Sequence, residues 1–356
     1  MWSLIADAVQ IPGLALIEST LKLNREFLVE TPVWEWNDIT KNRLVGPDRH
    51  VFCKLELLQK TGSFKPRGAL CVMKSLSREQ LLRGVTCVSA GNHALAVAYA
   101  ARLLGTTAHV VMPRTASKAR ITSCHDLGAA ISLEEDIASA FSKVRQIEED
   151  ERRYFVHPFE GPLTALGNAT LGLEFFRQVP DLSSIIIPVG GGGLCAGISL
   201  AIKQLNPKCK IIAVEPSGAN SLQRSLISGR PEKLDSVETI ADSLGSPCAM
   251  EYSFRVCQKF VDEIVTISDE SIRRGMGVLF SCAKIAAEPA GAASTAALLE
   301  SLSQKQTGPR VGLLVCGSNI DIRSFCQLAD DSLTVGGTSE GMDRFVTATT
   351  SQTVRG

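Results

Sequence analysis

The sequence predicts an α/β protein with a parallel sheet and more than one lobe, on three observations. Short β-branched runs are each followed by glycine or polar residues and then by a helix-period stretch. These runs are continuously apolar, as in strands that are buried on both faces of a parallel sheet. The chain has 356 residues, more than a single hydrophobic core usually supports. We therefore expect two lobes with a cleft between them.

The individual elements follow from these patterns. Two strand-to-helix units are expected, one with a strand at 85–89 and a helix at 93–104, the other with a strand at 184–189 and a helix at 194–205. Further apolar strands are predicted at 108–112, 210–214 and 311–315. Residues 116–154 are richer in charge and helix formers, and 156–159 are typical of a strand end and loop, so a lobe boundary is expected there.

Composition excludes several classes of protein. The 37 Lys and Arg balance 37 Asp and Glu, and no basic block interleaved with aromatic residues could follow a nucleic-acid backbone. The apolar N-terminus contains Asp7 and is broken at Pro12, so it fits neither a secretion signal nor a membrane span and is expected to form an ordered arm. We expect no nucleic-acid or membrane partner.

The cysteines and histidines argue against a zinc enzyme. The 11 cysteines form no CxxC pair, and several lie in apolar runs, which is typical of buried thiols in a reducing cytoplasm. The five histidines are too far apart for a helical metal pair. A cytoplasmic enzyme without zinc is expected.

Four consecutive glycines separate the 184–189 strand from the 194–205 helix, in PVGGGGL at 188–194. Residues without side chains let successive backbone N–H groups converge on an anion, and the helix N-terminus adds positive charge. A plain turn needs fewer glycines, because each loses conformational entropy on ordering. The loop lacks the lysine of a P-loop and the spacing of a dinucleotide fingerprint. It therefore predicts a phosphate site for a ligand other than ATP or NAD.

A lysine in a turn-rich segment is the candidate reactive group. In QKTGSFKPRGA at 59–69, Lys65 precedes Pro66, and a residue before proline is biased toward extended backbone. We therefore expect an extended backbone at Lys65. A lysine in a partly apolar site loses its proton more easily and can condense with an aldehyde. Since most lysines are solvated surface groups, this one is informative only beside the glycine loop.

Eight motifs occur in one order along the chain: KLELLQKTGSFKPRGAL, SAGNHALAVAYAARLLG, VHPFEGPLTALGNATLGLE, PVGGGGLCAGI, AVEPSGANS, ETIAD, AEPAGAAS and LLVCGSNID. Over about 15–321 the sequence resembles the fold type II pyridoxal-phosphate enzymes of the serine/threonine dehydratase and serine racemase group. The resemblance implies two lobes, each an open, twisted, mostly parallel sheet flanked by helices. It implies a large domain of 1–77 and 159–330, a small domain of 78–158, a flexible tail of 331–356, and a homodimer.

The resemblance also implies roles for individual residues. Lys65 would hold pyridoxal 5'-phosphate as a Schiff base, with Phe64 against the ring and Asn92 bonded to the ring hydroxyl. The phosphate would lie on Gly190, Gly191, Gly192, Gly193 and Leu194. The substrate carboxylate would lie on the loop formed by Ser89, Ala90, Gly91, Asn92 and His93. His93 could equally be an ordinary residue at a helix start.

Two positions indicate which reaction of the group this chain would catalyse. Cys316 falls where the resemblance implies a neutral partner for the pyridine nitrogen, which favours early loss of a β-leaving group, although a cysteine at a strand end can also simply pack in a core. Similar racemases carry a serine at the position of Ala90, and alanine has no proton to exchange on the second face of the ring. We therefore expect a dehydratase, with an amino-acid racemase as the alternative. A binding protein without activity would require loss of Lys65 or of the glycine loop.

The expected reaction begins when the substrate amine displaces Lys65, which then removes the Cα proton. The β-hydroxyl leaves as water, and hydrolysis gives a 2-oxo acid and ammonia. Serine, threonine, β-hydroxyaspartate and phenylserine all suit this core. Asn168 and Pro66 depart from the residues that relatives carry in their motifs, which leaves an unusual substrate open.

A cation site is the last expectation from the resemblance. Glu215, Ala219 and Ser221 correspond to a site near the phosphate loop, and relatives that bind divalent ions carry aspartate in place of Ser221. Because a divalent ion favours carboxylates, Ser221 indicates potassium or another monovalent ion, or none. Glu215 could instead merely cap a strand end.

Overall fold

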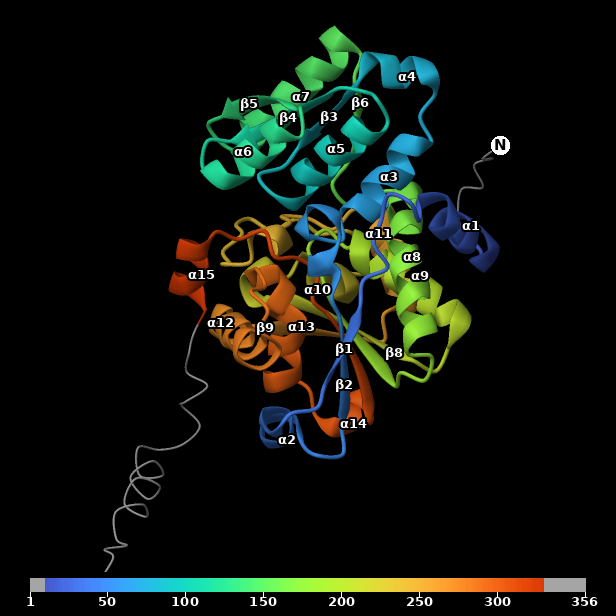
Figure 1. The fold of residues 1–356 in the computed structure, drawn as a ribbon, viewed down its shortest axis with the longest axis vertical. Coiled ribbons are helices and arrows are strands. Elements are labelled where there is room, and N and C mark those ends of the chain that lie inside the picture. The colour runs from blue at the N-terminus through green and yellow to red at the C-terminus, as the bar shows by residue number, and fades with distance from the viewer. Residues whose placement is uncertain (1–9, 330–356) are drawn as a thin grey trace, which may run out of the picture.

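Two sheets organise the chain, and the predicted α/β class is confirmed (Figure 1). The computed structural model describes residues 10–329. The start of the predicted N-terminal arm and the predicted tail at 331–356 lie outside these residues. The domain boundaries expected at 77/78 and 158/159 stay a prediction.

The larger sheet has six strands, of which only the edge pair β1 and β2 is antiparallel. In spatial order the strands are β1 (Val33–Trp36), β2 (His50–Lys54), β10 (Arg310–Leu314), β7 (Ser184–Pro188), β8 (Lys210–Pro216) and β9 (Glu263–Ile267). The central strands are largely apolar because helices cover both faces. Ile185, Ile186 and Ile212 are fully buried. The strands predicted at 184–189, 210–214 and 311–315 are thereby confirmed.

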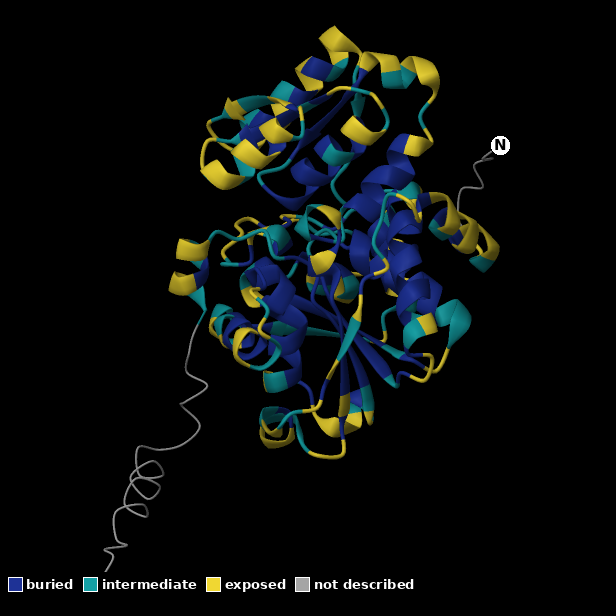
Figure 2. Ribbon diagram, in the orientation of Figure 1, coloured by how far each residue is buried: buried dark blue, intermediate teal, exposed yellow. Residues whose placement is uncertain are grey.

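Helices α8 (Pro162–Gln178) and α9 (Gly193–Leu205) lie on one side of this sheet, and α12 (Asp269–Val278) and α13 (Pro289–Glu300) lie on the other (Figure 1). Buried residues fill most of β2, β7, β8 and β10 and of helices α8, α9 and α13, while exposed ones gather mainly at outer ends and loops (Figure 2). The remaining helices of this part are α1 (Leu14–Asn24), α2 (Ile39–Val45), α3 (Pro66–Lys74), α10 (Ser221–Ser228), α11 (Glu251–Phe260), α14 (Gln304–Thr307) and α15 (Ile322–Leu328).

The smaller sheet is entirely parallel, as expected for strands joined by crossover helices. Its order is β5 (Ala130–Glu134), β4 (Ala108–Pro113), β3 (Val85–Val88) and β6 (Tyr154–Phe155). Its helices are α4 (Arg78–Arg83), α5 (Asn92–Leu103), α6 (Lys118–Asp126) and α7 (Ile137–Glu151). The strand-to-helix units predicted at 85–104 and 184–205 are both present, so one local pattern builds the framework of each lobe.

A buried cluster of charges ties β2, α3 and α8 together beneath the lysine segment. The Arg67 guanidinium donates to Glu56 Oε2 at 2.7 Å and to Glu174 Oε2 at 3.0 Å. Lys54 Nζ also donates to Glu174. These side chains are at most 4% exposed. Charges taken out of water must be paired in this way, so the cluster fixes where α3 begins.

Candidate active site

A cavity of about 600 Å³ gathers most of the predicted site residues from both lobes. Its wall includes Phe64, Lys65, residues 88–93, residues 190–194 and Cys316. Three of these segments directly follow strands β3, β7 and β10, and the carboxyl ends of parallel strands are where open α/β sheets bind ligands. The predicted cation residues Glu215, Ala219 and Ser221 do not line this cavity.

Lys65 lies immediately before α3, and its amine faces the cavity. The expected extended backbone is wrong, because Lys65 has φ −54° and ψ −33°. Pro66 is the first residue of the helix, where its fixed φ suits the helix and its missing N–H costs nothing, and this outweighs the usual bias before proline. Lys65 Nζ donates to the Pro158 carbonyl at 2.7 Å and lies 5.2 Å from the centroid of the Phe64 ring.

Burial lowers the pKa of Lys65 to about 8. Negative charge at Cys316 or Glu288 would raise the pKa again. Burial raises the pKa of the Cys316 thiol well above its usual value, so this group stays neutral. Lys65 therefore has a sizeable neutral fraction near neutral pH, which condensation with an aldehyde requires.

The glycine loop leads from β7 into α9 and has the properties of an anion cradle. Within residues 10–329, the backbone N–H groups of residues 190–194 find no acceptor. A Cβ on Gly193 would lie 2.1 Å from the Phe159 carbonyl oxygen, and one on Gly191 would lie 2.2 Å from the Phe159 ring. Gly192 has φ +89°, which favours glycine. Free donors at the start of a helix fit a phosphate group.

The loop from β3 into α5 offers a second set of donors. Ser89 Oγ accepts the Gly91 N–H at 3.1 Å. The N–H groups of Ala90, Asn92 and His93 find no acceptor in the described part of the chain. This loop therefore also suits an anion, such as the carboxylate of an amino acid.

His93 lies on the buried side of the same loop. Its Nε2 is 2.8 Å from the Val156 carbonyl oxygen. Burial, together with the nearby Lys65, lowers the pKa of His93 to about 3. The ring is thus neutral and donates to this carbonyl, so the geometry favours the reading of His93 as a residue that holds the chain in position.

Asn92 belongs to a polar network that sequence reasoning missed in part. Its Nδ2 donates to Glu288 Oε1 at 2.5 Å, and its Oδ1 accepts from Asn319 Nδ2 at 2.6 Å. Arg120 of α6 donates to Asp242 Oδ2 at 2.5 Å and to the Asn319 carbonyl at 2.8 Å. The network joins α5 and α6 of the smaller sheet to loops of the larger one.

Glu288 is fully buried beside Lys65 and Cys316. Burial and the neighbouring Asp242 raise the pKa of Glu288 to about 7, against the opposing effect of Arg120. A Cβ on Gly317 would lie 2.3 Å from Glu288 Oε1. The Glu288 carboxyl therefore leaves room only for glycine at position 317, directly after Cys316. Its only sequence signal is an acid in the small-residue motif AEPAGAAS.

Cys316 follows β10 and is 3% exposed. Its Sγ lies 3.4 Å from the Ala290 carbonyl oxygen. With its thiol neutral and its side chain at the cavity wall, it presents a weak hydrogen-bonding group instead of a carboxylate. Asn168, the departure in α8, lies beneath the glycine loop, where its Nδ2 donates to the Gly193 carbonyl at 3.1 Å.

The predicted cation residues lie between β8 and α10. The Glu215 carboxylate accepts the N–H groups of Leu222 and Gln223, both at 2.8 Å. Burial raises the pKa of Glu215 to about 8. Ser221 Oγ is buried and finds no hydrogen-bond partner. Between residues 10 and 329, no cluster of three or more His, Cys, Asp or Glu could hold a metal ion.

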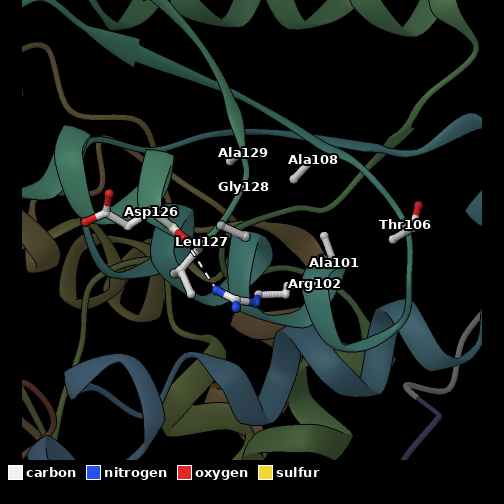
Figure 3. Close-up of a pocket in the computed structure, with 9 residues that line it drawn as sticks. Ala101, Arg102, Thr106, Ala108, Asp126, Leu127, Gly128 and Ala129 are labelled. Atoms are coloured by element: carbon white, nitrogen blue, oxygen red, sulfur yellow. Dashed lines mark hydrogen bonds between the residues drawn. The ribbon is translucent and has the colours of Figure 1, made fainter.

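A second hollow, of about 400 Å³, lies on the smaller sheet (Figure 3). Four of its nine lining residues are alanines, and the Arg102 guanidinium donates to the Asp126 carbonyl at 3.4 Å. It contains none of the predicted residues. None of the described helices has the length and apolar character to cross a membrane.

Comparison with known proteins agrees with this geometry. Phenylserine dehydratase of Ralstonia pickettii is 45% identical over 321 residues, which cover 90% of this chain and 97% of that protein. L-threonine ammonia-lyase of Thermotoga maritima is 39% identical, over 83% of this chain and 74% of that protein. The structure of maize serine racemase matches with a TM-score of 0.84 and 31% identity, over 95% of this chain and 100% of that chain. The family model described as pyridoxal-phosphate dependent enzyme matches residues 25–317. The resemblance to the fold type II group is thus confirmed, and the chain belongs to the pyridoxal-phosphate dependent enzymes.

Proposed function

We propose that this protein is a dehydratase, or ammonia-lyase, that converts a β-hydroxy amino acid to a 2-oxo acid and ammonia. The observation that carries the proposal is the position of Lys65. Its amine, with a pKa lowered to about 8, lies in one cavity with two sets of free N–H donors. Relatives named phenylserine dehydratase and L-threonine ammonia-lyase support the same reaction class.

The residues present fit pyridoxal phosphate. The N–H groups of residues 190–194 would hold the phosphate, and Lys65 would hold the aldehyde carbon. Phe64 would lie against the ring, and the neutral Cys316 thiol would face the pyridine nitrogen. One Asn92 N–H is taken by Glu288, and the other, 3.4 Å from Ser243 Oγ, would reach the ring hydroxyl.

When bound, this cofactor supplies an electron-withdrawing ring that stabilises negative charge at the substrate Cα. The loop of residues 89–93 binds and orients the substrate carboxylate through its N–H groups. Lys65 Nζ would serve as the base that removes the Cα proton. The β-hydroxyl takes up a proton and leaves as water, and the released enamine takes up water again to give the 2-oxo acid and ammonia.

A racemase is the alternative that the comparison with maize serine racemase keeps open. Racemization needs a proton donor on the face of Cα opposite Lys65. The methyl group of Ala90 cannot supply one. Elimination is therefore the better supported reaction.

Three further properties are proposals. Glu215, Ala219 and Ser221 bind potassium or another monovalent cation, which the unpartnered Ser221 Oγ supports. The chain forms a homodimer in solution, which light scattering would test. The protein is cytoplasmic, in keeping with cysteines that are all free thiols.

The deciding experiment is a panel of serine, threonine, β-hydroxyaspartate and phenylserine, scored for release of 2-oxo acid and ammonia. We expect Lys65→Ala to abolish release from every substrate. Lys60→Ala serves as the control, because this exposed lysine lies in the same segment. Turnover near the wild-type rate in Lys65→Ala would contradict the proposal.

A further inference from the structure

We propose that the cavity contains an aromatic side-chain subsite, formed by Phe141, Phe155, His157 and Phe159, that selects β-hydroxy amino acids with an aryl substituent. The inference rests on the proposed dehydratase function and adds the substrate class and the residues that select it. None of these four residues was singled out in the sequence as part of the site.

The backbone of residues 155–159 explains how three of the rings share one wall. The segment begins in β6 (Tyr154–Phe155) and bends at residues 158–159. Side chains alternate along a strand, so Phe155 and His157 share a side, and the bend that follows keeps Phe159 at the same cavity. Val156, between the first two rings, is fully buried and does not line the cavity. All three rings line the cavity.

The rings form a continuous series of edge-to-face contacts. Centroids of Phe159 and His157 are 4.7 Å apart with planes at 90°, and those of His157 and Phe155 are 5.7 Å apart at 74°. Phe141, from α7, extends the series at 6.4 Å and 76° from Phe155. These are favourable aromatic geometries, so the wall is held in shape before any substrate arrives.

The series begins beside the reactive amine. Lys65 Nζ donates to the carbonyl of Pro158, which lies between His157 and Phe159. Burial, together with Lys65, lowers the pKa of His157 to about 4, so at neutral pH this ring is uncharged like its neighbours. A substrate held at Lys65 would therefore meet an apolar aromatic wall alongside its β-carbon.

The far end of the wall leaves apolar surface uncovered. Phe141 is 37% exposed and Ile137 is 51% exposed, although both line the cavity. Uncovered apolar surface in a cavity favours an apolar occupant. A hydroxymethyl group, as in serine, is too short to cover it, whereas an aryl group extends from the β-carbon along the rings.

The charges of the cavity argue against an acidic substituent. The cation at this end is Arg145, which is exposed and has the acid Glu148 one helical turn away. A second carboxylate, as in β-hydroxyaspartate, would therefore meet no uncompensated positive charge there. The 45% identity to a protein named phenylserine dehydratase supports the same class.

Comparison of phenylserine with threonine tests the subsite in the holoenzyme. We expect wild-type kcat/KM to be higher for phenylserine. Phe141→Ala should lower kcat/KM for phenylserine about tenfold, because one ring contact and part of the apolar burial are lost, and should change the value for threonine by less than about threefold. Phe141→Leu should fall between the two, since it keeps apolar bulk without the ring.

Leu133→Ala is the matched control, because Leu133 is a 38% exposed apolar residue of β5, the strand before α7, and does not line the cavity. Binding is measured separately by calorimetry with L-phenylalanine and L-alanine, which have no β-hydroxyl. We expect Phe141→Ala to weaken the binding of L-phenylalanine and to leave the binding of L-alanine unchanged.

Each outcome decides between the two proposals. Threonine preferred by the wild type, or equal losses for both substrates in Phe141→Ala, would overturn the subsite and leave the dehydratase intact. If no substrate yields 2-oxo acid, the dehydratase fails, and calorimetry then decides the subsite. Loss of phenylalanine binding alone would support it, and unchanged binding would overturn it.

Discussion

The protonation of Lys65 should control how fast cofactor-free protein captures pyridoxal phosphate, because only a neutral amine attacks an aldehyde. With a pKa of about 8, about half of Lys65 is neutral at pH 8, against about 0.3% for an ordinary lysine. The capture rate should therefore fall about tenfold per pH unit below 8 and level off above it.

Glu288→Gln is the informative perturbation. Glu288 has a pKa of about 7 and is mostly ionised at pH 8, so its negative charge raises the pKa of Lys65. Glutamine keeps an oxygen that can accept the Asn92 N–H and removes the charge. The midpoint of the capture profile should thus move below that of the wild type, and capture at pH 7 should become faster.

Stopped-flow absorbance of the bound cofactor measures the rate at which Lys65 captures pyridoxal phosphate. At each pH this rate is divided by the rate at which a small free amine reacts with the same cofactor, which removes the effect of the cofactor's own titration. Glu135→Gln, at a carboxyl that is 81% exposed, should leave the midpoint unchanged. A wild-type midpoint near 10.5, or an upward shift in Glu288→Gln, would refute the reasoning.

Three further predictions concern stability, the phosphate loop and the second face of the substrate. Glu174→Ala leaves two buried cations without their shared partner and should cost about 3–5 kcal/mol in urea denaturation, whereas Glu135→Ala should stay within about 1 kcal/mol; equal costs would contradict this account of the cluster. Gly193→Ala forces a Cβ to 2.1 Å from a backbone oxygen and should weaken cofactor binding in a fluorescence titration about tenfold or more. Gly13→Ala, with nothing within 4 Å of its Cβ, should bind normally. Ala90→Ser should increase formation of the mirror-image amino acid relative to 2-oxo acid, as measured by chiral chromatography. An unchanged ratio would contradict the explanation that the wild type lacks a second base because residue 90 is alanine.

The parts of the fold that local patterns specify were predictable from the sequence. The strand, glycine loop and helix at 184–205 follow from one apolar run and four glycines, and the structure has β7 and α9 there. Lys65, singled out from the sequence as the reactive lysine, lines the cavity, but the extended backbone expected for it was wrong. Two local rules conflict at Pro66, and only the helix α3 that follows shows which one prevails.

The polar network and the aromatic wall could not be predicted, because they join residues far apart in the chain. Glu288 contacts Asn92 across 196 positions, and no periodicity encodes that contact. Phe141 reaches the cavity only because α7 packs along the smaller sheet. The alternation of rings at 155–159 was visible in the sequence, yet it could not be distinguished from an ordinary half-buried strand.

The most direct test of the central claim is to incubate the holoenzyme with one enantiomer of phenylserine or threonine, and to follow 2-oxo acid, ammonia and the mirror-image amino acid together. We predict that 2-oxo acid and ammonia appear in equal amounts and well ahead of the mirror-image product. Appearance of the mirror-image amino acid at an equal or faster rate would contradict an elimination in which Lys65 is the base at Cα.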